Sequence, residues 1–226
     1  MHSHVLPGID DGAPDIETSV HLIKGLYDLG IRKMVATPHI IGDLYRNTPE
    51  TIEAALIKTK QACVNGGISM ELSAAAEYLL DDHFLSLLKK KQPLLTIAGN
   101  YLLTEFSYTM QPVNIEEIIF AVITEGYRPI LAHPERYHYY HRNYNEYHRL
   151  NELGFHLQVN ILSLTGYYGK PVEKAAKYIL DKGLAEMVGT DLHHDRHLTA
   201  LKDAGNTIIF NRFLGDKNFN NLFSME

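Results

Sequence analysis

The sequence predicts an α/β fold of the TIM-like barrel type, in which parallel strands alternate with helices within one domain, residues 1–226. Short β-branched runs and longer helical patterns alternate about seven times, which is typical of βαβ units and a parallel sheet. The length of 226 residues fits, because α/β barrels commonly reach about 200–250 residues as a single domain. Neither G-x-G-x-x-G after a strand nor the G-x-x-x-x-G-K-S/T loop occurs, which disfavours nucleotide-binding folds.

The helices are predicted from apolar residues that recur at helical spacing after a capping residue. Asp15 caps the first helix and Gly30 ends it, while Thr48 and Pro49 open the second. The predicted helices are 15–30, 48–66, 81–90, 114–126, 143–153, 171–183 and one that begins near 196.

The strands are predicted from short apolar runs between these helices. The predicted strands are 31–39, 68–78, 93–99, 101–107, 128–136 with a loop at its end, 155–161 and 185–193. The tail, residues 216–226, is too polar to assign.

Composition and charge exclude several classes of function. The net charge of −6, from 21 basic and 27 acidic residues, argues against electrostatic binding to nucleic acid. No apolar run is long enough for membrane insertion, and the opening MHSHVLPGIDDG lacks the regions of a signal peptide. The single cysteine, Cys63, suits a reducing compartment, so we expect a cytoplasmic protein.

Metal-ligating side chains occur at or just past the ends of successive predicted strands. In a parallel barrel these carboxyl ends form one face, where barrel active sites are built. A single histidine or glutamate at a strand end is more often structural, but nine in register predict a shared metal site. The nine are His2, His4, Asp11, His39, Glu77, Glu105, His133, Asp191 and His193.

The chemistry of this ligand set limits the metal. Five imidazoles and four carboxylates without a thiolate favour Mn, Fe, Zn or Mg over a structural cysteine–zinc site. Nine ligands are too many for one ion and suggest two or three. Four carboxylates contribute −4 and three divalent ions +6, so the filled site would carry +2 and attract an anionic substrate.

Seven motifs in this order resemble the PHP (polymerase and histidinol phosphatase) superfamily of metal hydrolases. They are H-x-H, D-D-G, T-P-H, A-E-Y, E-F-S, A-H-P-E-R-Y and T-D-L-H, and they run from His2 to about Leu201. Within the superfamily they are similar to the manganese-dependent tyrosine-protein phosphatases of capsule and exopolysaccharide gene clusters. The resemblance implies a distorted (β/α)₇ barrel with three divalent ions, most commonly Mn.

The resemblance also implies a partition of the ligands. One ion would be held by His2, His4, Glu77 and Asp191, with Glu77 bridging. A second would take Glu77, Glu105 and His133, and a third Asp11, His39 and His193.

The sequence departs from the family pattern in two places. Family members carry an aspartate two residues before the first histidine, whereas this sequence begins Met1-His2, so we expect a truncated first strand and a less stable first metal site. The segment 137–148, YHYYHRNYNEYH, with five tyrosines and three histidines, is the second departure, and its function cannot be carried over from the family. We interpret it as a loop and helix face on the rim, with stacking on an aromatic substrate or a homo-oligomer contact as alternatives.

Residues for phosphoryl transfer are predicted near the ligands. A metal-activated water would attack phosphorus, and Arg136 is expected to grip the phosphoryl oxygens, with a structural salt bridge to Glu135 as the alternative. Arg196 is a second candidate clamp. His194 or His197 are candidate general acids. Cysteine-based catalysis is excluded, because the sixth residue after the only cysteine is Ser69 rather than arginine.

The favoured hypothesis is a protein-tyrosine phosphatase that opposes a bacterial tyrosine kinase regulating capsular or exopolysaccharide synthesis. A small-molecule phosphatase, such as a histidinol-phosphate phosphatase, is the alternative with the same chemistry. A non-catalytic metal-binding scaffold and a nucleic-acid phosphoesterase are less favoured, the first because unused clusters of ionised groups are costly to keep.

Overall fold

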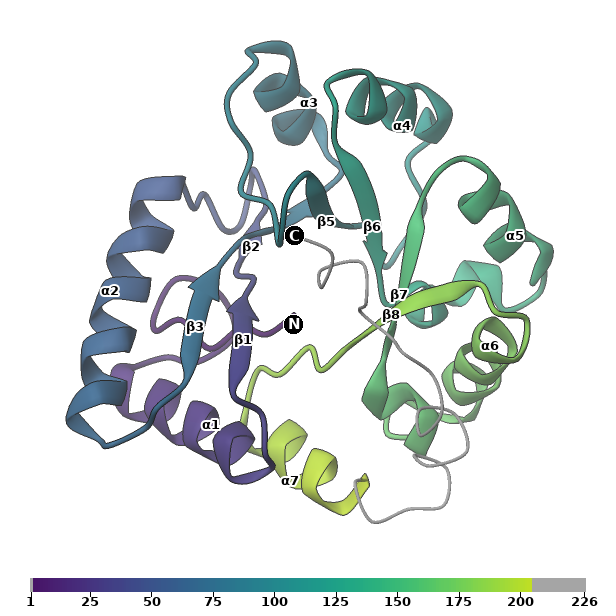
Figure 1. The fold of residues 1–226 in the computed structure, drawn as a ribbon. Coiled ribbons are helices and arrows are strands. Elements are labelled where there is room, and N and C mark those ends of the chain that lie inside the picture. The colour runs from purple at the N-terminus through teal and green to yellow at the C-terminus, as the bar shows by residue number, and fades with distance from the viewer. Residues whose placement is uncertain (1, 205–226) are drawn as a thin grey trace.

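Helices and strands alternate along the chain, and Figure 1 shows the helices around the outside of the strands. The structure is a computed structural model that describes residues 2–204. The strands are β1 (Lys33–Ala36), β2 (His39–Ile40), β3 (Glu71–Ala74), β4 (Glu77–Leu79), β5 (Tyr101–Glu105), β6 (Arg128–Ala132), β7 (His156–Asn160) and β8 (Ala185–Gly189). The helices are α1 (Ile16–Asp28), α2 (Pro49–Asn65), α3 (Asp82–Lys89), α4 (Ile115–Thr124), α5 (Asn145–Glu152), α6 (Lys170–Asp181) and α7 (Asp195–Ala204).

The capping residues act as the sequence predicts. The Thr18 N–H donates to the Asp15 carboxylate at 2.8 Å at the start of α1. Thr48 forms a capping box at the start of α2, with Pro49 as the first helical residue. These side chains satisfy backbone donors that have no partner within the helix, which fixes where each helix begins.

All strand pairs in the sheets are parallel. β1 pairs with β3, and the other strands follow the order β2-β4-β5-β6-β7-β8. The two sheets continue into each other, because the Ala75 N–H donates to the Ala36 carbonyl at 2.8 Å and the Glu77 N–H to the Pro38 carbonyl at 3.0 Å. The carboxyl ends of these strands therefore lie on one side of the molecule.

The N-terminal segment lies between the end of β1 and the chain that follows β8. The Thr37 N–H donates to the Ser3 carbonyl at 2.8 Å, and the His4 N–H donates to the Leu192 carbonyl at 2.8 Å. Ser3 forms an isolated parallel bridge with Leu192, and residues 2–15 contain no named strand. This segment carries the two histidines of the H-x-H motif.

The predicted strand 93–99 is wrong, because its backbone bonds to side chains and to a turn. The Leu94 and Leu95 N–H groups donate to the hydroxyls of Tyr127 and Tyr78, at 3.2 and 2.9 Å. Within the described part of the chain this segment contributes only an isolated antiparallel bridge between Ala98 and Tyr101. The predicted strands 31–39 and 68–78 are each divided into two short strands, and 185–193 ends at Gly189. The unassigned tail, residues 216–226, lies outside the described residues.

Both faces of the strands are covered by apolar side chains. Leu102 and Leu131 belong to the main hydrophobic core, which also contains the inner faces of the helices. Leu103 and Ile130 belong to a second, smaller cluster with Met187. Successive residues of a strand point to opposite faces, so the strands separate an outer from an inner apolar layer. No helix within residues 2–204 combines the length and apolar character that crossing a membrane requires.

Candidate metal centre

The nine predicted ligands gather on one side of the molecule, where β1, β3, β5, β6 and β8 end and the short strands β2 and β4 begin. They come from the N-terminal segment, the first residues of β2 and β4, the end of β5, and the turns after β6 and β8. Seven of the nine side chains are buried, while Asp11 and His193 are partly accessible. The nine are His2, His4, Asp11, His39, Glu77, Glu105, His133, Asp191 and His193.

Four ligand atoms form a compact group around one point. The Nε2 atoms of His2 and His4 lie 3.2 and 3.3 Å from Glu77 Oε2, and 3.2 and 3.4 Å from Asp191 Oδ1. Ligands held at about 2.1 Å from a tetrahedral ion would lie about 3.4 Å from one another. The group therefore has the spacing of a metal cage, and its members are those expected for the first ion.

Glu77 connects this group to a second one. Its Oε2 lies 3.3 Å from His39 Nδ1, and its Oε1 lies 3.2 Å from His133 Nε2. Glu105 completes the group at 2.9 Å from His39 Nδ1, and it lies 4.0 Å from His133 Nε2. The second group in the structure is therefore His39, Glu77 and Glu105. His133, expected in this set, lies beside it through Glu77 Oε1, and His39 is a member that was not expected.

Asp11 defines the third group, nearest the solvent. Its Oδ1 lies 3.5 Å from the Nε2 atoms of both His39 and His193, and its side chain is 52% exposed. His4 also contributes to this group, and its ring stacks on His193 with centroids 3.9 Å apart. The expected third set is present, and His4 and His39 lie between two groups each.

The donor atoms of the cluster fit metal ions. Both Glu77 oxygens, His2 Nε2, His4 Nε2 and His39 Nδ1 are buried and have no hydrogen-bond partner within residues 2–204. Buried polar atoms are normally hydrogen-bonded, since an unsatisfied one costs about 1–3 kcal/mol. Oxygen and nitrogen atoms that face one another at 3.2–3.3 Å without hydrogen bonds are typical of ligands placed for cations.

Hydrogen bonds on the far side of three rings leave Nε2 free as a ligand. His2 Nδ1 donates to Gln158 Oε1 at 2.7 Å, and His4 Nδ1 donates to Asp10 Oδ2 at 2.8 Å. His193 Nδ1 donates to the Asp191 carbonyl at 2.9 Å. Such partners fix the tautomer and ring orientation of metal-binding histidines.

Two buried carboxylates of the metal-free cluster, Glu77 and Asp191, are ionised. Burial works against the charge of Glu77, but His2, His133 and His4 beside it keep its pKa well below the ordinary value. The pKa of Asp191 is likewise lowered, against burial, by His2 and His193. Burial disfavours the imidazolium of His2, yet Glu77 and Asp191 raise its pKa to about 10. Without cations, protons on His2 and His4 offset the charge of these two carboxylates.

Backbone strain is concentrated at the ligands. His2, His133 and Asp191 have φ angles of 62°, 37° and 47°, and Lys91 is the other non-glycine residue with positive φ in the described chain. This left-handed region is uncommon for residues with a Cβ and costs of order 1–3 kcal/mol. The strain turns these side chains toward the cluster at points where a strand would carry them away.

Gly12 permits a close approach that the site needs. A Cβ at this position would lie 1.9 Å from the His4 carbonyl oxygen and 2.5 Å from its Cβ. The D-D-G loop can therefore lie directly on the H-x-H segment only with glycine here.

Arg136 lies at the edge of the cluster and contacts a ligand rather than Glu135. Its Nη1 donates to Asp191 Oδ2, which also accepts from Asn160 Nδ2 at 3.3 Å. Glu135 instead faces the interior, where it accepts from the Asn160 N–H and the Ser163 hydroxyl. The alternative of an Arg136–Glu135 salt bridge is therefore wrong.

Arg196 and the two candidate general acids lie on or next to α7. Arg196 is exposed and is not part of the three ligand groups. His194 is also exposed, and its ring stacks on His197 at 3.9 Å. His197 is buried, and its Nδ1 accepts a hydrogen bond from the His193 N–H at 3.2 Å.

The segment 137–148 packs mainly as an aromatic layer. Tyr137, Tyr140 and Tyr147 are buried in the main core. The Tyr139 hydroxyl donates to the Ser107 carbonyl at 3.1 Å, which joins the segment to the loop after β5.

The residues that hold the ligands in place were missed in the sequence. Asp10 stands beside predicted ligand Asp11, but a spacing argument selects only one of the pair. His156, Gln158 and Asn160 alternate with apolar residues on β7, and buried polar residues such as Gln158 and Asn160 along one face of a strand are a usable signal. Tyr108 and Tyr168, which approach Arg136, follow no pattern specific to phosphate chemistry.

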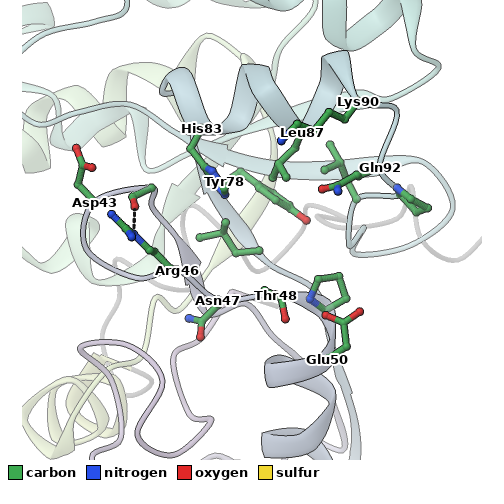
Figure 2. A pocket seen from close by; sticks show the side chains of 15 residues that line it. Asp43, Arg46, Asn47, Thr48, Glu50, Tyr78, His83, Leu87, Lys90 and Gln92 are labelled. Atoms are coloured by element: carbon green, nitrogen blue, oxygen red, sulfur yellow. Dashed lines mark hydrogen bonds between the residues drawn. The ribbon is translucent and has the colours of Figure 1, made fainter.

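A cavity of about 790 Å³ lies between the start of α2 and α3 (Figure 2). Ile40 and Tyr78 line it, and they directly follow His39 and Glu77 in the chain. Because neighbouring residues of a strand point to opposite faces, this cavity lies on the other side of β2 and β4 from the ligands. None of the nine predicted ligands lines it, so this cavity does not coincide with the metal centre.

Comparisons with protein families and with known proteins both relate this chain to one family. The family model of capsular polysaccharide synthesis proteins CpsB/CapC matches residues 1–225. The tyrosine-protein phosphatase YwqE of Bacillus subtilis (strain 168) is 28% identical over 194 residues, which cover 86% of this chain and 76% of YwqE.

Solved structures agree with this similarity. A structure from a study of YwqE from B. subtilis and CpsB from Streptococcus pneumoniae, described as unique metal-dependent tyrosine phosphatases, matches with a TM-score of 0.81 at 25% identity. The match covers 96% of this chain and 94% of that one. An amidohydrolase from Mycoplasma synoviae shares the fold more distantly, with a TM-score of 0.53 at 15% identity over 95% of this chain and 79% of that one.

Proposed function

Because the chain belongs to the CpsB/CapC family of capsular polysaccharide synthesis proteins, we propose that it is a metal-dependent protein-tyrosine phosphatase. The family expected from the seven motifs is confirmed. One observation on this chain's own residues supports the proposal most: eight of the nine predicted ligands form three groups, His133 contacts Glu77 beside them, and an arginine pairs with Asp191. Divalent ions, when bound, supply Lewis acidity and lower the pKa of water for attack on a phosphate ester.

Arg136 is the residue that we assign to the phosphoryl oxygens. Its Nη1 is used by Asp191, and its Nε and Nη2 have no hydrogen-bond partner within residues 2–204. A guanidinium presents paired N–H groups that match phosphate oxygens, and positioning with electrostatics does most of the work in phosphoryl transfer. Asp191 thus orients the Arg136 guanidinium through one oxygen and contributes to the first ligand group through the other.

We retain Arg196 as a second clamp. It follows ligand His193 by three residues and is exposed at the start of α7, so it would approach the substrate from the solvent side. His194 and His197 remain candidate proton donors to the leaving phenolate.

Several finer features belong to the same proposal. The strands would close into a distorted (β/α)₇ barrel with residues 2–4 as the short first strand, which the bonds of Ser3 and His4 to both neighbouring segments support. The centre would hold three divalent ions, most commonly manganese. The substrate would be a phosphotyrosine protein, with a bacterial tyrosine kinase of capsule synthesis as the expected one. The buried, unpaired Cys63 suits action in the cytoplasm.

The test compares phosphotyrosine peptide with histidinol phosphate on protein loaded with Mn²⁺. We expect faster turnover of the peptide, loss of activity with EDTA, and recovery with Mn²⁺. Faster turnover of histidinol phosphate would support the small-molecule phosphatase, and no turnover of either would support the scaffold.

Arg136→Ala tests the clamp. We expect kcat to fall about 100-fold, which is typical for loss of one donor to the charge of a transition state. Arg32→Ala is the matched control, because Arg32 also lies over a tyrosine ring but is exposed at the amino end of β1, whereas the ligands lie on the carboxyl side of the strands. An unchanged rate in Arg136→Ala with intact metal content contradicts the assignment.

A further inference from the structure

A small cavity opens beside the metal centre, at the side of Arg136. It has a volume of about 260 Å³ and is lined by Tyr108, Arg136, His138, Tyr168 and Val172. Two contacts join it to the ligands. The Tyr108 ring stacks on His133 with centroids 5.7 Å apart, and Arg136 pairs with Asp191.

Two tyrosine rings contact the guanidinium of Arg136. Its Cζ lies 4.4 Å from the ring centre of Tyr168 and 5.1 Å from that of Tyr108. The cavity therefore presents a cation, with N–H groups left to donate, next to two aromatic rings. A ligand that combines an anionic phosphate with an aromatic ring matches both features.

We propose that Tyr108 and Tyr168 form the walls of a slot that receives the phenyl ring of the substrate while Arg136 holds its phosphate. The inference rests on the proposed function and identifies the residues that select phosphotyrosine over aliphatic phosphate esters. The cavity is smaller than the roughly 300 Å³ at which drug-sized ligand sites begin, so it suits one ring. Tyr108 is 44% exposed and has ring surface available to a ligand.

The hydroxyl of Tyr168 is oriented for a further contact. Asn160 Nδ2 donates to it at 3.3 Å. Because the His193 N–H donates to His197 Nδ1, the proton of His197 lies on Nε2, which faces the same hydroxyl at 3.4 Å. The Tyr168 oxygen thus accepts twice, and its own proton is left to donate to an oxygen of the phosphate ester.

A different role would explain the same contacts. The two rings could serve only to hold the guanidinium of Arg136 in place. In that case a change in either ring would weaken every phosphate ligand equally, whereas a slot predicts an effect that depends on the aromatic ring of the ligand.

The experiment measures binding of phenylphosphonate and methylphosphonate to Mn²⁺-loaded protein by calorimetry. The two ligands share the acid group, differ in the ring, and are not phosphate esters, so binding is read without turnover. We expect the wild type to prefer phenylphosphonate, and Tyr108→Leu to weaken its binding about fivefold to tenfold with little effect on methylphosphonate. Tyr108→Phe should retain the preference.

Two variants complete the design. Tyr168→Phe keeps the wall but removes the hydroxyl, so it should weaken both ligands about equally, by about threefold to tenfold. Tyr27→Leu is the matched control, because Tyr27 lies 3.9 Å from the guanidinium of Arg32 outside the cavity, and it should change neither affinity.

The outcomes separate this inference from the proposed function. Equal wild-type affinity for the two phosphonates, no binding of either, or equal weakening of both in Tyr108→Leu overturns the slot. Ring-dependent binding in a protein that hydrolyses no aryl phosphate leaves the slot in place and overturns the proposed function.

Discussion

Asp10 joins two segments of the metal centre through one carboxylate. Its Oδ2 accepts from His4 Nδ1 at 2.8 Å and from the His39 N–H at 3.2 Å, while Oδ1 accepts from the Gly12 N–H at 2.9 Å. Burial opposes its charge, but His4 lowers its pKa, so it is ionised where the protein is folded. A negative charge behind a ligand ring raises the basicity of that ring.

Asp10→Asn should therefore weaken metal binding without removing a ligand. We expect about a 10-fold to 100-fold loss in Mn²⁺ affinity, measured by metal titration, since partners of this kind commonly have that effect. Asp43→Asn, an exposed change in the loop before α2, is the control and should bind Mn²⁺ like the wild type. Unchanged affinity in Asp10→Asn would show that His4 does not depend on this carboxylate.

The ligands could be predicted from sequence at this scale, whereas their partners could not. Glu77 and His133 stand out because metal-ligating residue types recur at successive strand ends. Gln158 lies 156 residues from the ring that it orients, and only the fold brings the two together. Arg136 was expected to contact phosphate or Glu135, and the ion pair with Asp191 depends on the turn after β8, which has no sequence signature.

At the scale of elements, β7 and β8 approach closely behind the first ligand group. A Cβ at Gly189 would lie 2.4 Å from Gln158 Oε1 and 3.0 Å from His2 Cβ. Glycine at the end of β8 therefore leaves space for the amide that orients His2.

Gly189→Ala should destabilise the protein and disturb the site together. We expect a loss of about 1–3 kcal/mol in the free energy of unfolding, measured in urea, because overpacking forces side chains and backbone apart. Gly66→Ala at the end of α2 is the matched control, because a Cβ there meets ordinary contacts of 3.4–3.8 Å, and it should change stability little. Equal stability of the two variants would contradict the packing argument.

The helices were predicted more accurately than the strands, for a physical reason. Asp15 and Thr48 act within one turn of sequence, so a helix start can be recognised locally. A strand ends where its partner ends, and the divisions at residues 36–39 and 74–77 follow from the pairing of two chain segments. The segment 93–99 is apolar enough to be predicted as a strand. Two of its backbone N–H groups donate instead to tyrosine hydroxyls from other parts of the chain, so they do not pair with a neighbouring strand.

At the scale of the whole molecule, the metal centre concentrates negatively charged side chains whose charge must be neutralised in the folded protein. The chain has a net charge of −6, and four of its carboxylates belong to the ligand set. In the metal-free protein, Glu77 and Asp191 are balanced by protonated histidines, as the raised pKa of His2 indicates. Metal ions and protons therefore compete for the same atoms.

Removal of metal should make stability depend on pH in a defined direction. The folded pKa of His2, about 10, is above its ordinary 6.5, so its protonation stabilises the metal-free fold fully below pH 6.5 and progressively less as the pH rises toward 10. The lowered pKa values of Glu77 and Asp191 act at the acidic end, where stability falls as these carboxylates gain protons. Deprotonation of the ligands favours metal binding. The free energy of unfolding of the loaded protein therefore rises over the same alkaline range in which that of the metal-free protein falls.

The difference in Tm between Mn²⁺-loaded and EDTA-treated protein should therefore widen from pH 6.5 to about pH 9. A single site at 100 times its Kd contributes about 2.7 kcal/mol, which corresponds to about 5–10 °C for a chain of this size. Scanning calorimetry at several pH values measures the difference, and Asp43→Asn should behave like the wild type. Glu77→Gln, which removes the charge shared by two ligand groups, should largely abolish it. A difference that stays constant or narrows with rising pH would show that protons on these histidines do not compete with the metal.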